Sequence, residues 1–218
     1  MSLVRKRIAQ TYPEEARYCL MSAYLFCARV SEVVGRICPS DRVNTEARGP
    51  KGSDVRLDNF VLGPIKEGVA IFTVKTAKRE GLERSIALPL NPRYEPWTES
   101  LYKYFKSHGD RKVFPFTRQK ASRYASKAFE GLTYPIYKYK IWENGKVKDE
   151  PKKHSKPFAT HALRHLRTSE LIEYYGFTGA DLSIYGGWTL QNTLAVGSAV
   201  GRYAHLNWRQ YFPKLLKE

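Results

Sequence analysis

Apolar residues recur at helical spacing over several stretches of the chain, and segments rich in glycine and proline separate these stretches. Residues 13–36 predict a helix-rich opening in which Gly35 ends a helix. Residues 96–130 predict further helices with a break near Pro115, because the apolar side chains from Trp97 onward fall on one helix face. Each of these patterns predicts a helix with one buried side.

The C-terminal part of the chain predicts more helices. One spans about 160–175 and is ended by Gly176, and another follows Thr178 with Asp181 near its start. We expect the final segment, 193–217, to be helical as well.

Two runs rich in β-branched residues lie between the helical stretches, at 69–74 and 85–90. A polar and basic connection from Lys75 to Arg84 joins them, so we expect a hairpin with a long charged tip. Residues 39–65 are rich in Pro, Gly, Asp and Asn and predict a loop with short elements.

A second hairpin is predicted within residues 133–157. Asn144–Gly145 is a strong signal for a two-residue turn. The segment is rich in lysine, which argues against burial. We expect a basic hairpin or a loop insertion, which either follows DNA phosphates or is simply solvated.

Together these patterns predict an α+β protein that is mostly helical and has a small antiparallel β-sheet. The 218 residues, of which 42% are hydrophobic, suffice for a buried core. We expect residues 1–218 to form a single domain.

The charge of the chain indicates the kind of partner. Lys and Arg number 37 against 21 acidic residues, which gives a formal net charge of +16. Such an excess favours nucleic acid, because each cation placed on a phosphate releases a condensed counterion. The alternative is a basic surface with no specific partner.

The three cysteines, Cys19, Cys27 and Cys38, match no zinc-binding spacing, so we expect reduced core thiols and no metal or other cofactor. No apolar run approaches the roughly 18 residues that a membrane-spanning helix needs. No signal peptide is visible behind the basic N-terminus. We therefore expect a cytoplasmic protein with no membrane partner.

His161 and Arg164 lie three residues apart in a predicted helix, so they share one face. Arginine offers a planar fork of donors to two phosphate oxygens, and histidine can donate a hydrogen bond or move a proton near neutral pH. The pair fits a phosphoryl-transfer site, although an isolated pair of this kind is more often a solvated helix face.

Five segments, taken in order, resemble the motifs of the tyrosine recombinases, the phage-type integrase family, over about Glu14 to Asn207. The first is Cys27–Val33, similar to G-x-R-x-S-E-L/V around Arg29, and the second is Lys75, at the start of the basic hairpin. The third is His161–His165, similar to H-x-L-R-H. The last two are Gly186–Thr189, with Trp188 at the H/W position, and Arg202–His205, with Tyr203 in a tyrosine-x-histidine segment.

The resemblance implies the catalytic domain of a site-specific DNA recombinase or integrase. Tyr203 would attack the scissile phosphate and give a 3′-phosphotyrosyl intermediate and a free 5′-hydroxyl, with no high-energy cofactor. Arg29 and Arg164 would hold the phosphate oxygens. Lys75 would protonate the leaving oxygen, with Lys78 and Arg79 of the same connection as alternatives.

The remaining implied roles concern proton transfer and assembly. His161 would accept a proton from Tyr203 or donate to the phosphate, and Trp188 would donate its indole N–H. Glu32 would orient Arg29. The expected partner is double-stranded DNA, on which the protein would form a dimer or tetramer, with the nucleoid of a prokaryotic host as its location and a virus or mobile element as its source.

Two departures from the family pattern stand out. Tyr203 lies farther after Trp188 than is usual, so Tyr211 is the alternative nucleophile, and the tyrosine could serve its own site or a neighbour's. The family's N-terminal core-binding domain does not fit before Arg29, so we expect it to be absent.

Two other function classes stay open. A type IB topoisomerase or telomere resolvase would share this chemistry, but the topoisomerase pattern Ser-Lys-x-x-Tyr is not found at Tyr203. A non-catalytic DNA-binding module could keep the fold alone. Covalent protein–DNA adducts that depend on Tyr203 would separate the catalytic classes from the third.

Overall fold

The computed structural model describes residues 2–35, 49–75, 83–138, 141–143, 146–148, 152–187 and 207–217, with the backbone alone from 135 to 154. Within these residues the protein is α+β, with eight α-helices and a small three-stranded antiparallel sheet, which confirms the predicted class. The helices are α1 (Leu3–Ala9), α2 (Glu14–Leu25), α3 (Val30–Val34), α4 (Thr98–Lys106), α5 (Arg118–Ala128), α6 (Thr160–Glu173), α7 (Gly179–Gly186) and α9 (Phe212–Leu215), with 3-10 turns η1 (Gly52–Asp54) and η3 (Trp208–Gln210).

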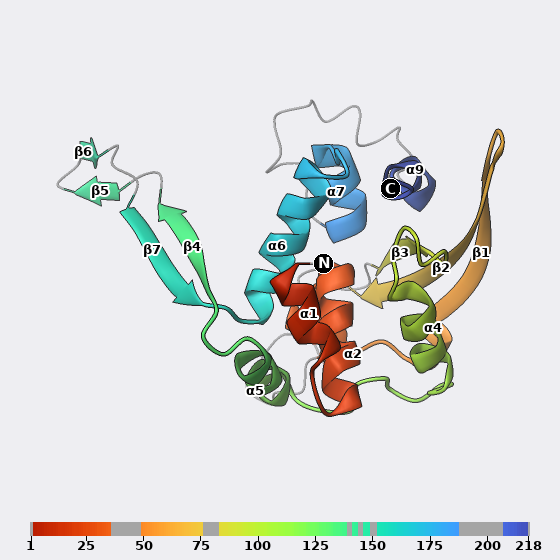
Figure 1. Cartoon of the computed structure of the whole chain (residues 1–218), viewed down its shortest axis with the longest axis horizontal. Coiled ribbons are helices and arrows are strands. Elements are labelled where there is room, and N and C mark those ends of the chain that lie inside the picture. Colours follow the sequence, from red (N-terminus) through yellow and green to blue (C-terminus); the bar gives the residue numbers. More distant parts are fainter. Residues whose placement is uncertain are drawn as a thin grey trace.

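Helix α2 lies at the centre of the helical body, as Figure 1 shows, and α4, α5 and α6 pack around it. Eight of its 12 residues are buried, so it is apolar on most of its surface. Its C-terminal end leads directly into the segment that carries Arg29. The central helix therefore fixes the position of the first predicted site residue.

The sheet has the strand order β1–β2–β3. Phe72 of β2 contacts Phe26 and Phe105 with ring centroids 4.9 and 5.1 Å apart. Phe60 of β1 lies on the opposite face, with its ring 4.9 Å from Phe212 of α9. Both faces are therefore covered. The strands are β1 (Val55–Leu62), β2 (Ile65–Lys75) and β3 (Glu83–Pro89).

Residues 133–157, which we name the β-arm, contain the predicted second hairpin. Figure 1 shows the arm projecting away from the helical body. Its strands pair antiparallel, β4 with β7 and, nearer the tip, β5 with β6 on either side of Asn144–Gly145. The turn itself lies outside the described residues. The strands are β4 (Thr133–Lys138), β5 (Ile141–Glu143), β6 (Lys146–Lys148) and β7 (Lys152–Pro157).

Helix α7 shows how local sequence fixes an element near the site. The Thr178 hydroxyl caps the helix by accepting from the Asp181 amide, and the Asp181 carboxylate accepts from the Thr178 amide at 2.7 Å. The helix ends at Gly187, whose φ of 68° favours glycine. These signals place the predicted helix, and they set where the chain leaves it.

Three expectations for the fold were wrong or incomplete. Residues 39–65 were expected to be a loop with short elements, yet residues 55–62 form the eight-residue strand β1. Only Val55 and Phe60 of this strand are buried, so its buried positions do not show the two-residue alternation of a strand. Helix α1 was not expected, and a buried Ile8 attaches it to the core. Of the segment 193–217, the described residues hold only a 3-10 turn and the four-residue α9. None of the described helices has the length and apolar character needed to cross a membrane.

Candidate active site

The candidate site is built around the carboxylate of Glu32, whose side chain is only 1% exposed. Glu32 lies in the first turn of α3, and one carboxylate oxygen accepts from the Arg29 amide at 3.0 Å. Its other oxygen lies 3.1 Å from Nη1 of Arg29. Because a buried carboxylate requires compensating charge, Glu32 draws cationic side chains to this point, as expected of a residue that orients Arg29.

Arg84 of β3 is the second cation. Its Nη2 lies 3.2 Å from Oε2 of Glu32, and the side chain is 5% exposed. Nη1 donates to the carbonyl of Phe26 at 2.9 Å and to the carbonyl of Tyr185. Arg84 therefore ties the end of α2, the sheet and the end of α7 together at the carboxylate.

Arg164 of α6 is the third cation, with a side chain that is 4% exposed. Its Nη1 lies 3.7 Å from Oε2 of Glu32, and its Nη2 donates to the Gly186 carbonyl at 3.2 Å. Burial lowers the pKa of the Arg164 guanidinium, and the nearby guanidinium groups of Arg84 and Arg29 lower it further, against opposing effects of Cys27 and Glu32. The site thus concentrates positive charge.

Among the described residues, this group holds three guanidinium groups, each within 3.7 Å of its one carboxylate. Arg29 is the member that reaches solvent, with its side chain 30% exposed, whereas Arg84 and Arg164 are buried. Clustered guanidinium groups bind phosphate and carboxylate groups well, because their donors form a rigid fork. The arrangement can therefore accept an anion at its open side. We name Arg29, Arg84, Arg164 and Glu32 the arginine cluster.

His161 lies one turn before Arg164 on α6 and is exposed. Its ring is 4.6 Å from that of His165. Partial burial lowers the pKa of His161 from its usual 6.5, and the positive charges of His165, Arg164 and Arg29 lower it further. At neutral pH the ring is therefore uncharged and has a nitrogen that can accept a proton.

Lys75 ends β2 and is half exposed, with an ion pair of 3.5 Å to Glu83. Its strand partner is Glu83, one step beyond the pairing of Val74 with Arg84. Because successive side chains of a strand point to opposite faces, the Lys75 side chain lies on the face opposite to that of Arg84, and the ion pair that the structure shows is with Glu83 and not with Glu32. The alternatives, Lys78 and Arg79, lie outside the described residues.

Trp188 and Tyr203 also lie outside the described residues. The chain enters their segment directly after Gly186, whose carbonyl is bound by Arg164. It returns at Asn207, just before Tyr211, whose ring contacts Tyr185 of α7 at 5.1 Å. The described residues on the two sides of this segment therefore lie close to α7, and Gly186 contacts the arginine cluster.

Tyr211, the alternative nucleophile, is placed elsewhere. It is fully buried, and its hydroxyl accepts from the Ala87 amide at 2.8 Å and donates to the Ser85 carbonyl at 3.3 Å. Burial, together with the nearby Tyr185, raises the pKa of Tyr211 far above that of a free tyrosine. The expectation that Tyr211 could serve as nucleophile is therefore wrong, because its hydroxyl is occupied in the core against β3.

Arg84 is the residue that the sequence interpretation missed, since it was assigned to the connection between the strands. It shares a strand face with Ile86 and Leu88, which are fully buried. A charged residue at an apolar-face position is the signal that would have found it, because such a residue needs a partner in the core.

No protein-family model matches the chain, and no curated protein or solved structure to which it was compared matches either. The described residues also contain no group of three His, Cys, Asp or Glu side chains that could hold a metal ion. The structure thus defines an α+β protein in which three arginines meet at one buried carboxylate.

Proposed function

We propose that the protein is a tyrosine-recombinase-type enzyme that cleaves and rejoins DNA strands through a 3′-phosphotyrosyl intermediate. The observation that carries the proposal is the convergence of Arg29, Arg164 and Glu32, since Arg29 and Arg164 come from distant motifs and meet at one buried carboxylate. The order of five motifs suggested this grouping before any geometry was considered. A solvated helix face would not bury Arg164 against Glu32.

The chemistry follows from the charge that develops at phosphorus. The Tyr203 hydroxyl attacks, the bond from phosphorus to the 5′-oxygen breaks, and the non-bridging oxygens gather negative charge. Arg29 and Arg164 stabilise these oxygens, and donors aimed at developing charge contribute about 10²–10³ each in rate. The buried Glu32 holds these two arginines in place before DNA binds.

Proton transfer completes the step. The uncharged His161 accepts the proton of the Tyr203 hydroxyl, and Lys75 donates a proton to the leaving 5′-oxygen. Trp188 donates its indole N–H to a phosphate oxygen. A 5′-hydroxyl from a second strand then reverses the reaction, so the phosphodiester energy is kept in the intermediate and no ATP is needed.

The partner in this proposal is double-stranded DNA, with self-association into a dimer or tetramer on it. Exchange between two duplexes requires at least two active sites, and cyclic assemblies are the common way to bring them together. The DNA to which the protein binds would place it in the nucleoid of a prokaryotic host.

The proposal is tested by covalent capture, because the DNA site is unknown. A pool of duplexes with a randomised core and a nick near it releases a short fragment after cleavage, which traps the intermediate. Protein carrying DNA after denaturation in detergent is isolated, the DNA is sequenced, and the linked peptide is identified by mass spectrometry. We expect an adduct whose phosphotyrosine is Tyr203.

Two variants make the test specific. Tyr203→Phe should abolish the adduct, whereas Tyr12→Phe, at a tyrosine that is 86% exposed, should not change it. No adduct with the unmodified chain over the whole pool would sink the proposal. Relaxation of supercoiled DNA without site preference would instead favour the topoisomerase class.

A further inference from the structure

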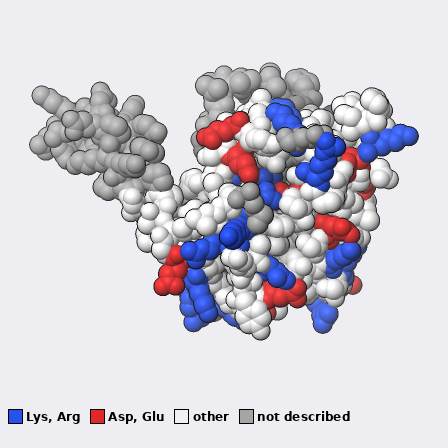
Figure 2. Space-filling model, viewed as in Figure 1, with Lys and Arg blue, Asp and Glu red and all other residues white. Residues whose placement is uncertain are grey.

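The paired strands at the base of the β-arm, β4 and β7, are unusually basic. Their twelve residues, Thr133–Lys138 and Lys152–Pro157, contain four lysines and one histidine but no Asp or Glu. On the face of the body seen in Figure 2, by contrast, acidic side chains lie among the basic ones. These two strands thus carry a net positive charge.

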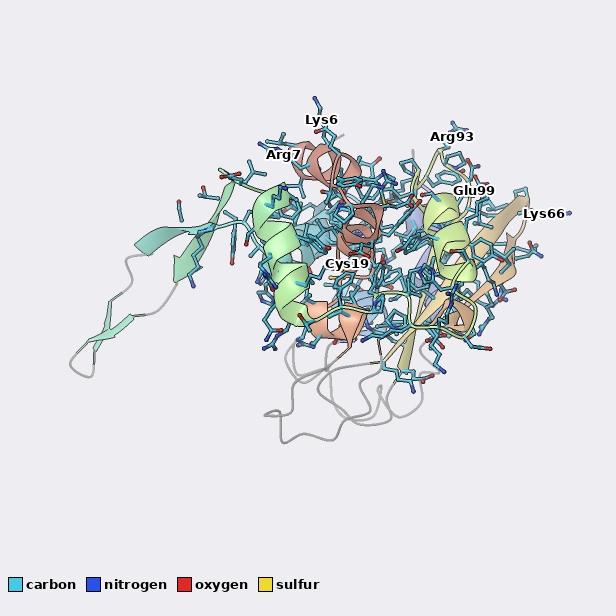
Figure 3. The ribbon with its side chains drawn as sticks, turned by 90° about the horizontal axis from the view of Figure 1, so that it is seen from below. Lys6, Arg7, Cys19, Lys66, Arg93 and Glu99 are labelled. Atoms are coloured by element: carbon cyan, nitrogen blue, oxygen red, sulfur yellow. The ribbon has the colours of Figure 1, made fainter. Side chains whose placement is uncertain are left out.

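The arm is attached firmly at its base and projects from the body. Phe158, directly after β7, has its ring 4.9 Å from Phe129 at the end of α5, and its amide donates to the Leu132 carbonyl at 2.9 Å. Beyond this point the paired strands extend away from the helices, as Figures 1 and 3 show from two directions. The base therefore fixes where the paired strands point.

The base of the arm adjoins the candidate site. The Tyr134 ring of β4 stacks on His165 of α6 at 6.4 Å, and His165 contacts His161 at 4.6 Å. β7 also leads into α6 within three residues. A ligand at the arginine cluster would therefore have the arm beside it.

A ribbon of this kind gains from an anionic partner. Two-stranded hairpins are at best marginally stable in water when nothing packs on them. The register places Lys138 directly opposite Lys152, and like charges at facing positions destabilise the pair. At about 3.4 Å per residue, six paired residues extend roughly 20 Å, and a two-stranded ribbon fits the major groove of B-form DNA.

We infer that the β-arm binds the phosphate groups of duplex DNA next to the arginine cluster. Its cations are lysines, which act as point charges on phosphates and read no base edge with a planar fork. The arm therefore positions the duplex without selecting its sequence. The inference rests on the proposed function for the duplex at the site, and it adds the element that holds the flanking DNA.

The experiment measures DNA affinity directly and needs no cleavage. Fluorescence anisotropy gives the dissociation constant of the full chain for a labelled 30-base-pair duplex over a series of salt concentrations. Because each phosphate contact contributes about 0.9 to the slope of log K against log salt, Lys152→Gln/Lys153→Gln should lower the slope by about 2. At 0.1 M salt the affinity of this variant should be roughly 10- to 60-fold below that of the unmodified chain, and the loss should be the same for duplexes of unrelated sequence.

The matched control removes two lysines from the opposite side of the molecule. Lys66 lies on the β1–β2 hairpin, far from the arm in Figure 3, and Lys106 ends α4. Lys66→Gln/Lys106→Gln changes the net charge equally, so it should reproduce only the general effect of charge. A second arm variant replaces residues 135–155 by Asn-Gly, which closes the Tyr134 and Lys156 pair with a two-residue turn.

The outcomes distinguish a failure of this inference from a failure of the proposed function. Affinity and slope equal to those of the control double variant would overturn the inference, even if Tyr203-dependent adducts form. Reduced affinity and slope in both arm variants would support it, even if no adduct is ever found. Loss of self-association in sedimentation analysis with unchanged DNA affinity would overturn it as well, and would assign the arm to a second copy of the chain.

Discussion

Replacing Glu32 by glutamine should destabilise the protein strongly although the two side chains have nearly the same shape. Glu32 faces three guanidinium groups at 3.1, 3.2 and 3.7 Å, and its side chain is 1% exposed. Two unit charges 3.2 Å apart interact by about 5 kcal/mol at an effective dielectric constant of about 20. The variant loses these attractions and leaves the repulsion between Arg29, Arg84 and Arg164.

Relaxation and water entry reduce this figure, and breaking a buried ion pair from one side is usually destabilising by about 3–5 kcal/mol. For a chain of this size each kcal/mol moves the melting temperature by about 2–4 °C, so Tm should fall by about 6–20 °C. The control is Glu99→Gln, at a carboxylate that is 57% exposed and paired with Lys103 on the surface. That change should move Tm by no more than about 4 °C, because exposed pairs contribute at most about 1 kcal/mol.

A double-mutant cycle gives the sharper test. Arg84→Met removes one guanidinium and leaves an apolar chain on the face that carries Ile86 and Leu88. In Glu32→Gln/Arg84→Met the two losses should partly cancel, with a coupling of about 2 kcal/mol or more measured by urea unfolding. Effects that add within about 0.5 kcal/mol would show that the carboxylate does not hold the cluster, and our account of the site would be wrong.

Three further predictions follow from the same contacts. Arg164→Ala should slow adduct formation about 10²- to 10³-fold in a quenched time course, whereas Arg56→Ala, at an exposed strand position, should leave the rate unchanged. Because the pKa of His161 lies below 6.5, the rate of adduct formation should be constant near pH 7 and should fall as the pH drops through that lowered pKa. His161→Asn should remove this fall at acid pH from initial rates measured between pH 5 and 8. Burial raises the pKa of Glu170, but Arg167 and a tyrosine hydroxyl lower it more, so that the net pKa lies below 4.5. This carboxylate therefore stabilises the fold above about pH 4.5, and the stabilisation is lost as the pH falls through the folded-state pKa. Glu170→Gln should reduce the dependence of the urea unfolding midpoint on pH in the acid range.

The sequence predicted those parts of the site that depend on local pattern. His161 and Arg164 share a helix face because they are three residues apart, and α6 places them so. The capping residues Thr178 and Asp181 predicted the start of α7, which carries Gly186 to the cluster. Each of these features is decided within one or two helical turns, where spacing and capping are informative.

The contacts that close the site could not be predicted in this way. Arg84 donates to carbonyls of Phe26 and Tyr185, which are 58 and 101 positions away in the chain. A backbone carbonyl has no side-chain identity, so no residue pattern announces that it will bind a guanidinium. For the same reason Tyr211 looked like a candidate nucleophile until its hydroxyl was found between the backbone groups of Ala87 and Ser85.

The composition of the arginine cluster itself argues for a site and not only for a stabilising contact. A buried ion pair adds little stability, and apolar residues of similar volume in its place are often neutral or more stable. Two further guanidinium groups around a carboxylate that is already paired with Arg29 increase repulsion, which is the opposite of what stability favours. The exposed side chain of Arg29 leaves the cluster open to an anion. Under the proposed function, the phosphate of a DNA strand brings negative charge and acceptor oxygens to the exposed side chain of Arg29, so binding should stabilise the cluster.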